Sequence, residues 1–379
     1  MPQSSDTDPS EHDSTENEVA LMNTRSIVGT AQAASCYFRT SVAAPYRKAL
    51  VQITERCNLT CAHCFVSSGP YGDAMPLAQI QSRVIPQLAA ARVTRVTLTG
   101  GEPFVHEDLL EVVGAFRTVG IGVGICTNAT LATDDQIHEL AAMDVHVNVS
   151  LDGFSENSHG RFRGNRQSFH TTVATVRRFA AAGSLQGLLC TPNSLAEDRE
   201  YAELCVFARE QGARYVLMNP LSSMGRGVKS QRKLASSQDH MRRVHTLTEP
   251  FAGDLDMVHI RFPNDAKPLA GCEAGRIIYV FTAGEVTVCP YLVFAARTPQ
   301  SQHQDTEFIV GNVRQHDDIA QRLDAYRFHE RYPVGDNPTC GSCALSSGCG
   351  KGCPAAVVSA GERIGAVDAE VCPVTPTPG

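Results

Sequence analysis

Apolar, β-branched runs alternate with helical patterns from about residue 47 to about residue 220. The segments between the runs repeat apolar residues at i, i+3 and i+4, and several end in glycine, a helix C-terminal signal. This rhythm predicts six β/α units around a parallel sheet, either open or curved into a partial barrel. In both cases ligands bind at the carboxyl ends of the strands. The predicted strands span residues 49–54, 93–99, 121–127, 145–151, 185–191 and 214–219.

The pattern is different on both sides of this region. Residues 1–30 begin with an acidic, polar stretch and predict a disordered tail. Residues 21–46, which overlap the end of this stretch, fit either a short strand or an arm packed on the core. Residues 226–260 are at first basic and polar, which indicates a linker with one helix. Residues 261–375 are rich in Gly, Pro and Cys and predict a small second domain, held by metal rather than by a large apolar core.

Composition narrows the class of protein. The 379 residues carry a net charge of −7, whereas a general binder of nucleic acid or of an anionic membrane needs the opposite sign. No apolar run approaches the roughly 18 residues that span a bilayer, and the N-terminus does not resemble a signal peptide, so we expect a cytoplasmic protein. In a reducing compartment, 14 cysteines point to metal or redox chemistry rather than to disulfides.

Three cysteines follow the first predicted strand, in the segment CNLTCAHCF. Cys57, Cys61 and Cys64 on one short loop can hold three corners of a [4Fe–4S] cube and leave the fourth iron open, as a catalytic centre needs. A zinc site with His63 as fourth ligand, or a redox thiol pair, fits this motif equally well. The second predicted strand ends in GGEP, whose glycines permit close approach of the backbone to a ligand and whose Glu102 adds a carboxylate.

The cysteine loop and GGEP together resemble the radical S-adenosylmethionine (SAM) superfamily, over a core domain of residues 47–225. The resemblance implies that the open iron chelates SAM and that reductive cleavage gives a 5′-deoxyadenosyl radical, which abstracts a hydrogen atom from substrate. It leaves the catalytic residues for the substrate step unknown. The implied SAM contacts are Gly100, Gly101 and Glu102 in GGEP, Ser150 and Asp152 at the fourth strand, and, as weaker candidates, Arg163 and Asn128. A turn or helix cap is an alternative role for Asp152.

The C-terminal cysteines are similar in spacing to the SPASM extension of radical SAM enzymes. The expected fold is thus α/β, a partial (β/α)6 TIM-type barrel followed by a small Cys-rich SPASM domain with two auxiliary [4Fe–4S] clusters, three clusters in all. By resemblance, one auxiliary cluster takes Cys340, Cys343, Cys349 and Cys372, and the other takes Cys272, Cys289 and Cys353.

The second of these clusters lacks one ligand. Relatives such as the mycofactocin maturases carry a further cysteine where this chain has Tyr279, so the cluster is expected to be open, held by another ligand, or incomplete. Tyr279 is otherwise a strand-core tyrosine. Four further cysteines stand singly in apolar surroundings and are interpreted as buried inert thiols, two of them on barrel strands where they can line a pocket: Cys36, Cys126, Cys190 and Cys205.

SPASM enzymes mostly modify ribosomally made peptides by crosslinking, decarboxylation, epimerisation or oxidation, which is the function we expect for this oxidoreductase or lyase. The alternative is a dehydrogenase, epimerase or decarboxylase of a small sugar or nucleoside intermediate. Pro290 stands where sulfatase maturases have a catalytic Asp, which argues against formylglycine formation. Expected partners are an electron donor such as flavodoxin or ferredoxin and, for a peptide substrate, a separate recognition protein. A non-catalytic iron–sulfur carrier has no need of GGEP.

Overall fold

The protein is described by a computed structural model over residues 31–37 and 42–374. The predicted tail over residues 1–30 lies outside the described residues. Of the segment 21–46, residues 31–37 pack as an arm against the C-terminal half, and residues 21–30 and 38–41 lie outside the described residues. Among the helices within the described ranges, none has both the length and the apolar character required to cross a membrane.

Seven parallel strands form the main part of one sheet, and six of them coincide with the predicted strands to within two residues. Their order is sequential from β1 to β7, as β/α units produce. The end strands of the sheet do not pair with each other in the described residues, so the curved sheet is a partial barrel. The strands are β1 (Arg47–Thr54), β2 (Val93–Gly100), β3 (Gly122–Thr127), β4 (His146–Ser150), β5 (Leu185–Cys190), β6 (Tyr215–Met218) and β7 (Asp256–His259).

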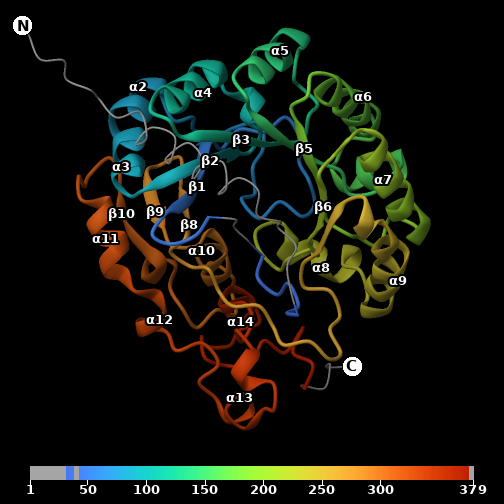
Figure 1. The fold of residues 1–379 in the computed structure, drawn as a ribbon, viewed down its shortest axis with the longest axis vertical. Helices are drawn as coiled ribbons and strands as arrows, with labels where there is room; N and C mark the ends of the chain where they lie inside the picture. The colour runs from blue at the N-terminus through green and yellow to red at the C-terminus, as the bar shows by residue number, and fades with distance from the viewer. Residues whose placement is uncertain (1–30, 38–41, 375–379) are drawn as a thin grey trace, which may run out of the picture.

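Helices cover the outer face of this sheet (Figure 1). The helix α4, for example, buries an apolar stripe formed by Leu109, Val112, Val113 and Phe116. The helices that follow β1 to β5 are α2 (Leu77–Gln79) and α3 (Ile85–Ala90), joined by a π-helical turn, then α4 (Leu109–Thr118), α5 (Asp134–Ala142), α6 (Ser168–Ala181) and α7 (Asp198–Glu210).

Residues 226–260 differ from the predicted linker with one helix. They form two helices, α8 (Gly227–Leu234) and α9 (Gln238–Thr248), and then β7, which extends the parallel sheet beyond β6. The apolar positions of α9 are few, with Met241 and Val244 buried beside His240 and Thr248, so its hydrophobic stripe is weak in the sequence. The strand β7 is four residues long, too short for an alternating pattern to stand out.

The C-terminal residues add three strands to the other edge of the same sheet. β8 (Ile277–Val280) pairs in parallel with β1, and β9 (Glu285–Thr287) and β10 (Ile309–Asn312) follow in antiparallel order. One hydrophobic core runs through both halves, so the expectation that metal replaces a large apolar core in the second half is wrong. The helices of the C-terminal half are α10 (Pro290–Ala296), α11 (Ile319–Tyr326), α12 (Phe328–Arg331), α13 (Pro338–Ser342) and α14 (Pro354–Ser359).

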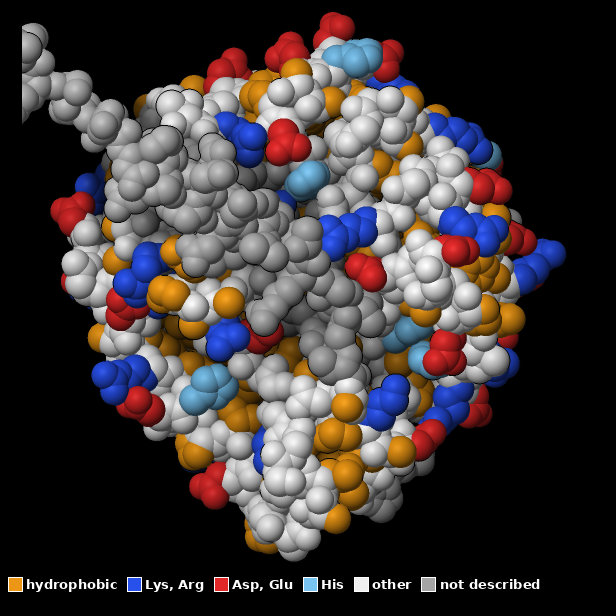
Figure 2. Space-filling model, viewed as in Figure 1, with side chains coloured by type: hydrophobic (Ala, Val, Ile, Leu, Met, Phe, Trp, Pro, Cys, Tyr) orange, Lys and Arg blue, Asp and Glu red, His pale blue; other side chains and the backbone are white. Residues whose placement is uncertain are grey.

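This arrangement places the loops after the parallel strands at one end of the barrel. The C-terminal helices α10 and α14 lie below β8 and β1 in Figure 1. On the face seen in Figure 2, acidic and basic side chains alternate around the rim, so charge of both signs surrounds the sheet.

Candidate functional site: a cysteine loop at the barrel mouth

The three cysteines lie on the loop that follows β1. Cys57 and Cys61 are buried and Cys64 is half-buried, and all three line a cavity of about 320 Å³. The Leu59 N–H donates to Cys57 Sγ at 3.4 Å, the kind of hydrogen bond that stabilises a ligating thiolate. Without metal, burial raises the pKa of the Cys57 thiol to about 12, so loading must release protons.

Arg226, at the start of α8, braces this loop. Its Nε donates to the carbonyl oxygen of Cys61 at 2.8 Å and its Nη1 donates to that of Ser68 at 2.6 Å. Its own N–H donates to the carbonyl oxygen of Cys64 at 3.0 Å. In the sequence this residue falls in the predicted basic linker, and nothing in its local pattern shows that it reaches a loop more than 150 positions earlier in the chain.

The zinc alternative for the cysteine loop does not fit the structure. His63 stacks on Phe162 with ring centroids 4.4 Å apart, and burial lowers its pKa to about 4. Across residues 31–37 and 42–374, no three or more His, Cys, Asp and Glu side chains converge tightly enough to hold a single metal ion. The thiolates that hold an iron–sulfur cube bind different iron atoms and therefore lie further apart than the ligands of a single ion. Three thiols spread along one cavity fit a cube better than an ion.

The two glycines of GGEP bring the end of β2 against the cysteine loop. A Cβ at Gly100 would lie 2.3 Å from the carbonyl oxygen of Thr54, and one at Gly101 would lie 2.2 Å from that of Arg56. Instead, the Gly101 N–H donates to Thr54 and the Glu102 N–H donates to Arg56. The close approach that these glycines permit is therefore, in the described residues, an approach of backbone to backbone.

Glu102 is almost completely buried and joins the ends of β2 and β3. Its Oε1 accepts from the Thr127 hydroxyl at 2.6 Å and from the Phe104 N–H at 3.2 Å, and its Oε2 accepts from the Asn128 N–H at 2.7 Å. Burial raises the pKa of this carboxyl, and the three hydrogen bonds oppose that shift. A carboxylate has about four acceptor sites, so one remains for a donor in the cavity.

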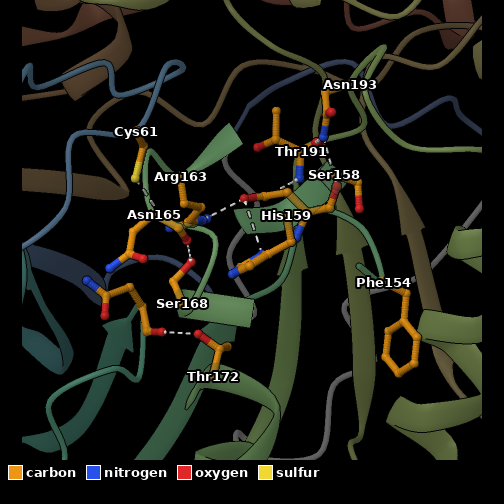
Figure 3. Close-up of polar contacts among 12 residues, drawn as sticks. Cys61, Phe154, Ser158, His159, Arg163, Asn165, Ser168, Thr172, Thr191 and Asn193 are labelled. Carbon is orange, nitrogen blue, oxygen red and sulfur yellow. Dashed lines mark hydrogen bonds and ion pairs between the residues drawn. The ribbon is translucent and has the colours of Figure 1, made fainter. Parts of the chain in front are cut away.

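Asp152 and Arg163 form a buried ion pair next to Cys61. Arg163 Nε lies 2.6 Å from Asp152 Oδ2, and its Nη1 lies 3.9 Å from Cys61 Sγ, as the direction of Arg163 in Figure 3 shows. Asp152 Oδ1 also accepts from the Thr191 N–H at 2.8 Å. Burial would raise the pKa of Asp152, but the Arg163 charge overcomes this and holds the pKa below its usual value.

All seven predicted SAM contacts and the three cysteines of the loop line the same cavity. The contacts come from the carboxyl ends of three strands and from the loop after β4, although they are separated by up to 63 positions in the sequence. The seven are Gly100, Gly101, Glu102, Asn128, Ser150, Asp152 and Arg163. Asn128 is fixed there because its carbonyl oxygen accepts from the Thr172 hydroxyl of α6 at 2.9 Å.

A second cavity, of about 30 Å³, lies among the C-terminal cysteines. Cys272, Cys289 and Cys353 line it, as the predicted grouping requires, and Cys36 lines it too. Tyr279 does not line this cavity. Its ring packs against Phe281 and Phe294 instead, and its hydroxyl has no hydrogen-bond partner among the described residues. Tyr279 is thus a buried strand residue of β8.

The other four predicted ligands lie on α13, on the loop between α13 and α14, and after α14. Backbone N–H groups approach the sulfurs of two of them: Leu345 donates to Cys343 Sγ, and Leu269 and Lys351 donate to Cys349 Sγ, each at 3.4 Å. Cys340 and Cys372 complete the set, and all four are partly exposed. Their assignment to one cluster remains a prediction.

The comparisons with known proteins identify the family of the N-terminal domain. The model of the radical SAM superfamily matches residues 51–204. Residues 51–204 are a radical SAM domain. The cofactors of this superfamily are a [4Fe–4S] cluster and SAM, so the chain is an enzyme that uses SAM radical chemistry.

The similarity to known proteins extends beyond the radical SAM domain. The mycofactocin maturase MftC of Mycobacterium tuberculosis is 29% identical over 335 residues, covering 84% of this chain and 81% of the relative. The subtilosin biosynthesis protein AlbA of Bacillus subtilis is 27% identical over 248 residues, 64% of this chain and 54% of that protein. SuiB of Streptococcus suis bound to precursor peptide SuiA shares the fold, with a TM-score of 0.66 at 16% identity, over 96% of this chain and 82% of that one.

Proposed function

We propose that this chain is a radical SAM maturase that modifies a ribosomally made peptide. The observation that carries the proposal is the single cavity of about 320 Å³ lined by three cysteines and all seven predicted SAM contacts. Bound there, a [4Fe–4S] cluster and SAM supply the reductive cleavage that starts radical chemistry in this superfamily. The peptide as substrate is supported by MftC and AlbA, whose names assign them to natural-product maturation, and by the fold shared with peptide-bound SuiB.

The residues of the chain have distinct roles in this proposal. Cys57, Cys61 and Cys64 hold the cluster, and Arg226 fixes the loop that carries them. Glu102 offers its remaining acceptor site to the SAM ammonium. Arg163, which is buried and charged beside Cys61, has donors directed into the cavity for the SAM carboxylate, and Asp152 fixes its orientation.

The C-terminal half is proposed to be a SPASM domain over residues 261–375 that holds two auxiliary clusters. An electron donor such as flavodoxin or ferredoxin is the proposed reductant in the cytoplasm. Spacing of the cysteines and the cavity shared by Cys272, Cys289 and Cys353 support this part of the proposal.

Co-expression with peptides tests the substrate class. Short open reading frames that neighbour the gene would be expressed with this chain, and the peptides examined by mass spectrometry. We expect one peptide to change mass by the loss of hydrogens or of carbon dioxide. The matched control is the chain with Cys57, Cys61 and Cys64 all replaced by alanine, which should leave the peptide unchanged. Turnover of a sugar or nucleoside with every peptide left intact would contradict the proposal.

Glu102→Gln tests the assignment of the SAM ammonium. A charge-assisted hydrogen bond contributes about 1.5–3 kcal/mol, so removing it should weaken SAM binding by roughly ten- to a hundredfold. Anaerobic titration of the reconstituted protein measures this affinity, and iron content should stay constant. Glu111→Gln, an exposed change on α4, serves as the control. Wild-type SAM affinity in the Glu102 variant would show that this carboxylate only joins β2 to β3.

A further inference from the structure

The segment of residues 33–37 is fixed against the chain segments that carry the C-terminal cysteines. Ala33 forms a parallel bridge to Leu269, and its N–H and carbonyl groups bond to the segment 268–270 at 2.8 and 2.9 Å. The Ser35 hydroxyl donates to the carbonyl oxygen of Ala270 at 2.9 Å. Tyr37 stacks on Tyr291, which lies two residues after Cys289, with ring centroids 4.5 Å apart. These contacts hold Cys36 in one place, because they lie on both sides of it.

Arg261 and Asp368 also hold Cys36 in its position. They form a fully buried bidentate pair with N–O distances of 2.7 and 2.9 Å. Arg261 also donates to the carbonyl oxygen of Ser35 at 3.1 Å, and Asp368 accepts from the Cys353 N–H at 2.9 Å. One buried ion pair thus ties the residue before Cys36 to the backbone of Cys353.

The Cys36 thiol points at the other cysteines. Its sulfur lies 3.2 Å from the carbonyl oxygen of Gly271 and 3.6 Å from that of Gly352, the residues that directly precede Cys272 and Cys353. Cys36, Cys272, Cys289 and Cys353 all line the cavity of about 30 Å³.

We propose that Cys36 is the fourth thiolate of the auxiliary iron–sulfur cluster held by Cys272, Cys289 and Cys353. The inference rests on the proposed function, since it presumes that this cluster exists. A [4Fe–4S] cube takes four thiolates when fully ligated, and the structure brings four to one cavity. On binding, the S–H bond of Cys36 breaks, a sulfur–iron bond forms and the proton leaves to solvent, with no change in oxidation state.

A closed cluster changes what the auxiliary site can do. With four thiolates, no iron is available to bind substrate directly, so the site serves to pass electrons or to hold structure. It also couples the metal to the chain upstream of the barrel, because Cys36 becomes a covalent anchor for residues 31–37. The cluster then needs no ligand from Tyr279, which agrees with the packing of that side chain outside the cavity.

The test uses the full chain in which Cys57, Cys61 and Cys64 are alanine, so that the open iron of the SAM cluster does not interfere. To this parent, Cys36→Ala and Cys36→Ser are added separately. The matched controls are Cys205→Ala, a buried cysteine on α7, and Tyr279→Phe. Each protein is reconstituted anaerobically, its iron is counted, and ¹³C-cyanide is added as a probe of open iron, detected by its coupling in the electron paramagnetic resonance spectrum.

The parent and both controls should hold about eight irons per chain, four for each of two cubes, and should not bind cyanide. Cys36→Ala should either bind cyanide at one iron or lose about four irons while its metal-free form keeps the circular dichroism spectrum of the parent. Cys36→Ser keeps the size of the side chain, and its spectrum should shift even if the alanine variant fails to fold.

Three results would overturn the inference. Cyanide binding by the parent would mean an open cluster that Cys36 does not close. Unchanged iron content and spectra in both Cys36 variants would mean an inert thiol, while the proposed clusters themselves stand. A parent with no iron at all would remove the auxiliary clusters from the proposed function, and the role of Cys36 with them.

Discussion

Replacing Cys57, Cys61 and Cys64 together with alanine is expected to abolish SAM cleavage. The three thiols line the cavity that the predicted SAM contacts share, so their loss removes the proposed site for SAM and an open iron. Production of 5′-deoxyadenosine from SAM by the reduced protein should fall to background, and about four irons per chain should be lost, one cube. The brown colour of any auxiliary clusters should remain.

The matched control is Cys126→Ala, because Cys126 lines the same cavity but lies on β3, away from the cysteine loop. This variant should retain its iron and its SAM cleavage. If the triple variant still forms 5′-deoxyadenosine at the wild-type rate, SAM is cleaved elsewhere in the chain and the assignment of the cysteine loop is wrong.

Asp152→Ala should cost stability as well as activity. It leaves the Arg163 guanidinium buried without its carboxylate, and removing one partner of a buried ion pair typically costs about 3–5 kcal/mol. In a chain of this size, that loss corresponds to a drop of roughly 4–6 °C in the midpoint of thermal unfolding. The double variant with Arg163→Met should recover part of the loss, because no unpaired charge remains.

The control for this prediction is Asp254→Ala, which breaks an exposed pair with Arg209. Exposed pairs contribute about 0–1 kcal/mol, so its midpoint should hardly move. If the losses of the two single variants at the Asp152–Arg163 pair simply add in the double variant, the pair is not coupled. The arrangement of the cavity wall would then have to rest on the backbone contacts of Asp152.

The strands of the barrel could be predicted because their signals are local. The six runs of β-branched residues from 49–54 to 214–219 correspond to β1 to β6, each bounded by a helix with a clear apolar stripe. β7 was missed because four residues carry too little pattern. β8 was assigned to a separate domain because its pairing with β1 joins residues more than 200 positions apart, and no local feature encodes that pairing.

The residues of the candidate site also differ in how far the sequence predicts them. The cysteine loop and GGEP are short motifs whose residues are adjacent in sequence, so their chemistry is readable before any fold is known. Arg226 and Cys36 act across the fold, and each looks unremarkable beside its sequence neighbours. A single cysteine upstream of the barrel, together with a predicted auxiliary cluster that lacks one ligand, was the available signal for Cys36, whereas nothing marked Arg226.

Transfer of deuterium from a peptide tests the central claim most directly. A substrate peptide found by co-expression would be prepared with deuterium on its side chains and incubated with the reduced enzyme and SAM. The account predicts 5′-deoxyadenosine that carries deuterium, formed in proportion to modified peptide. Modified peptide accompanied by 5′-deoxyadenosine without deuterium, even when each candidate residue is fully labelled at every carbon-bound position, would contradict hydrogen abstraction from the peptide by this enzyme.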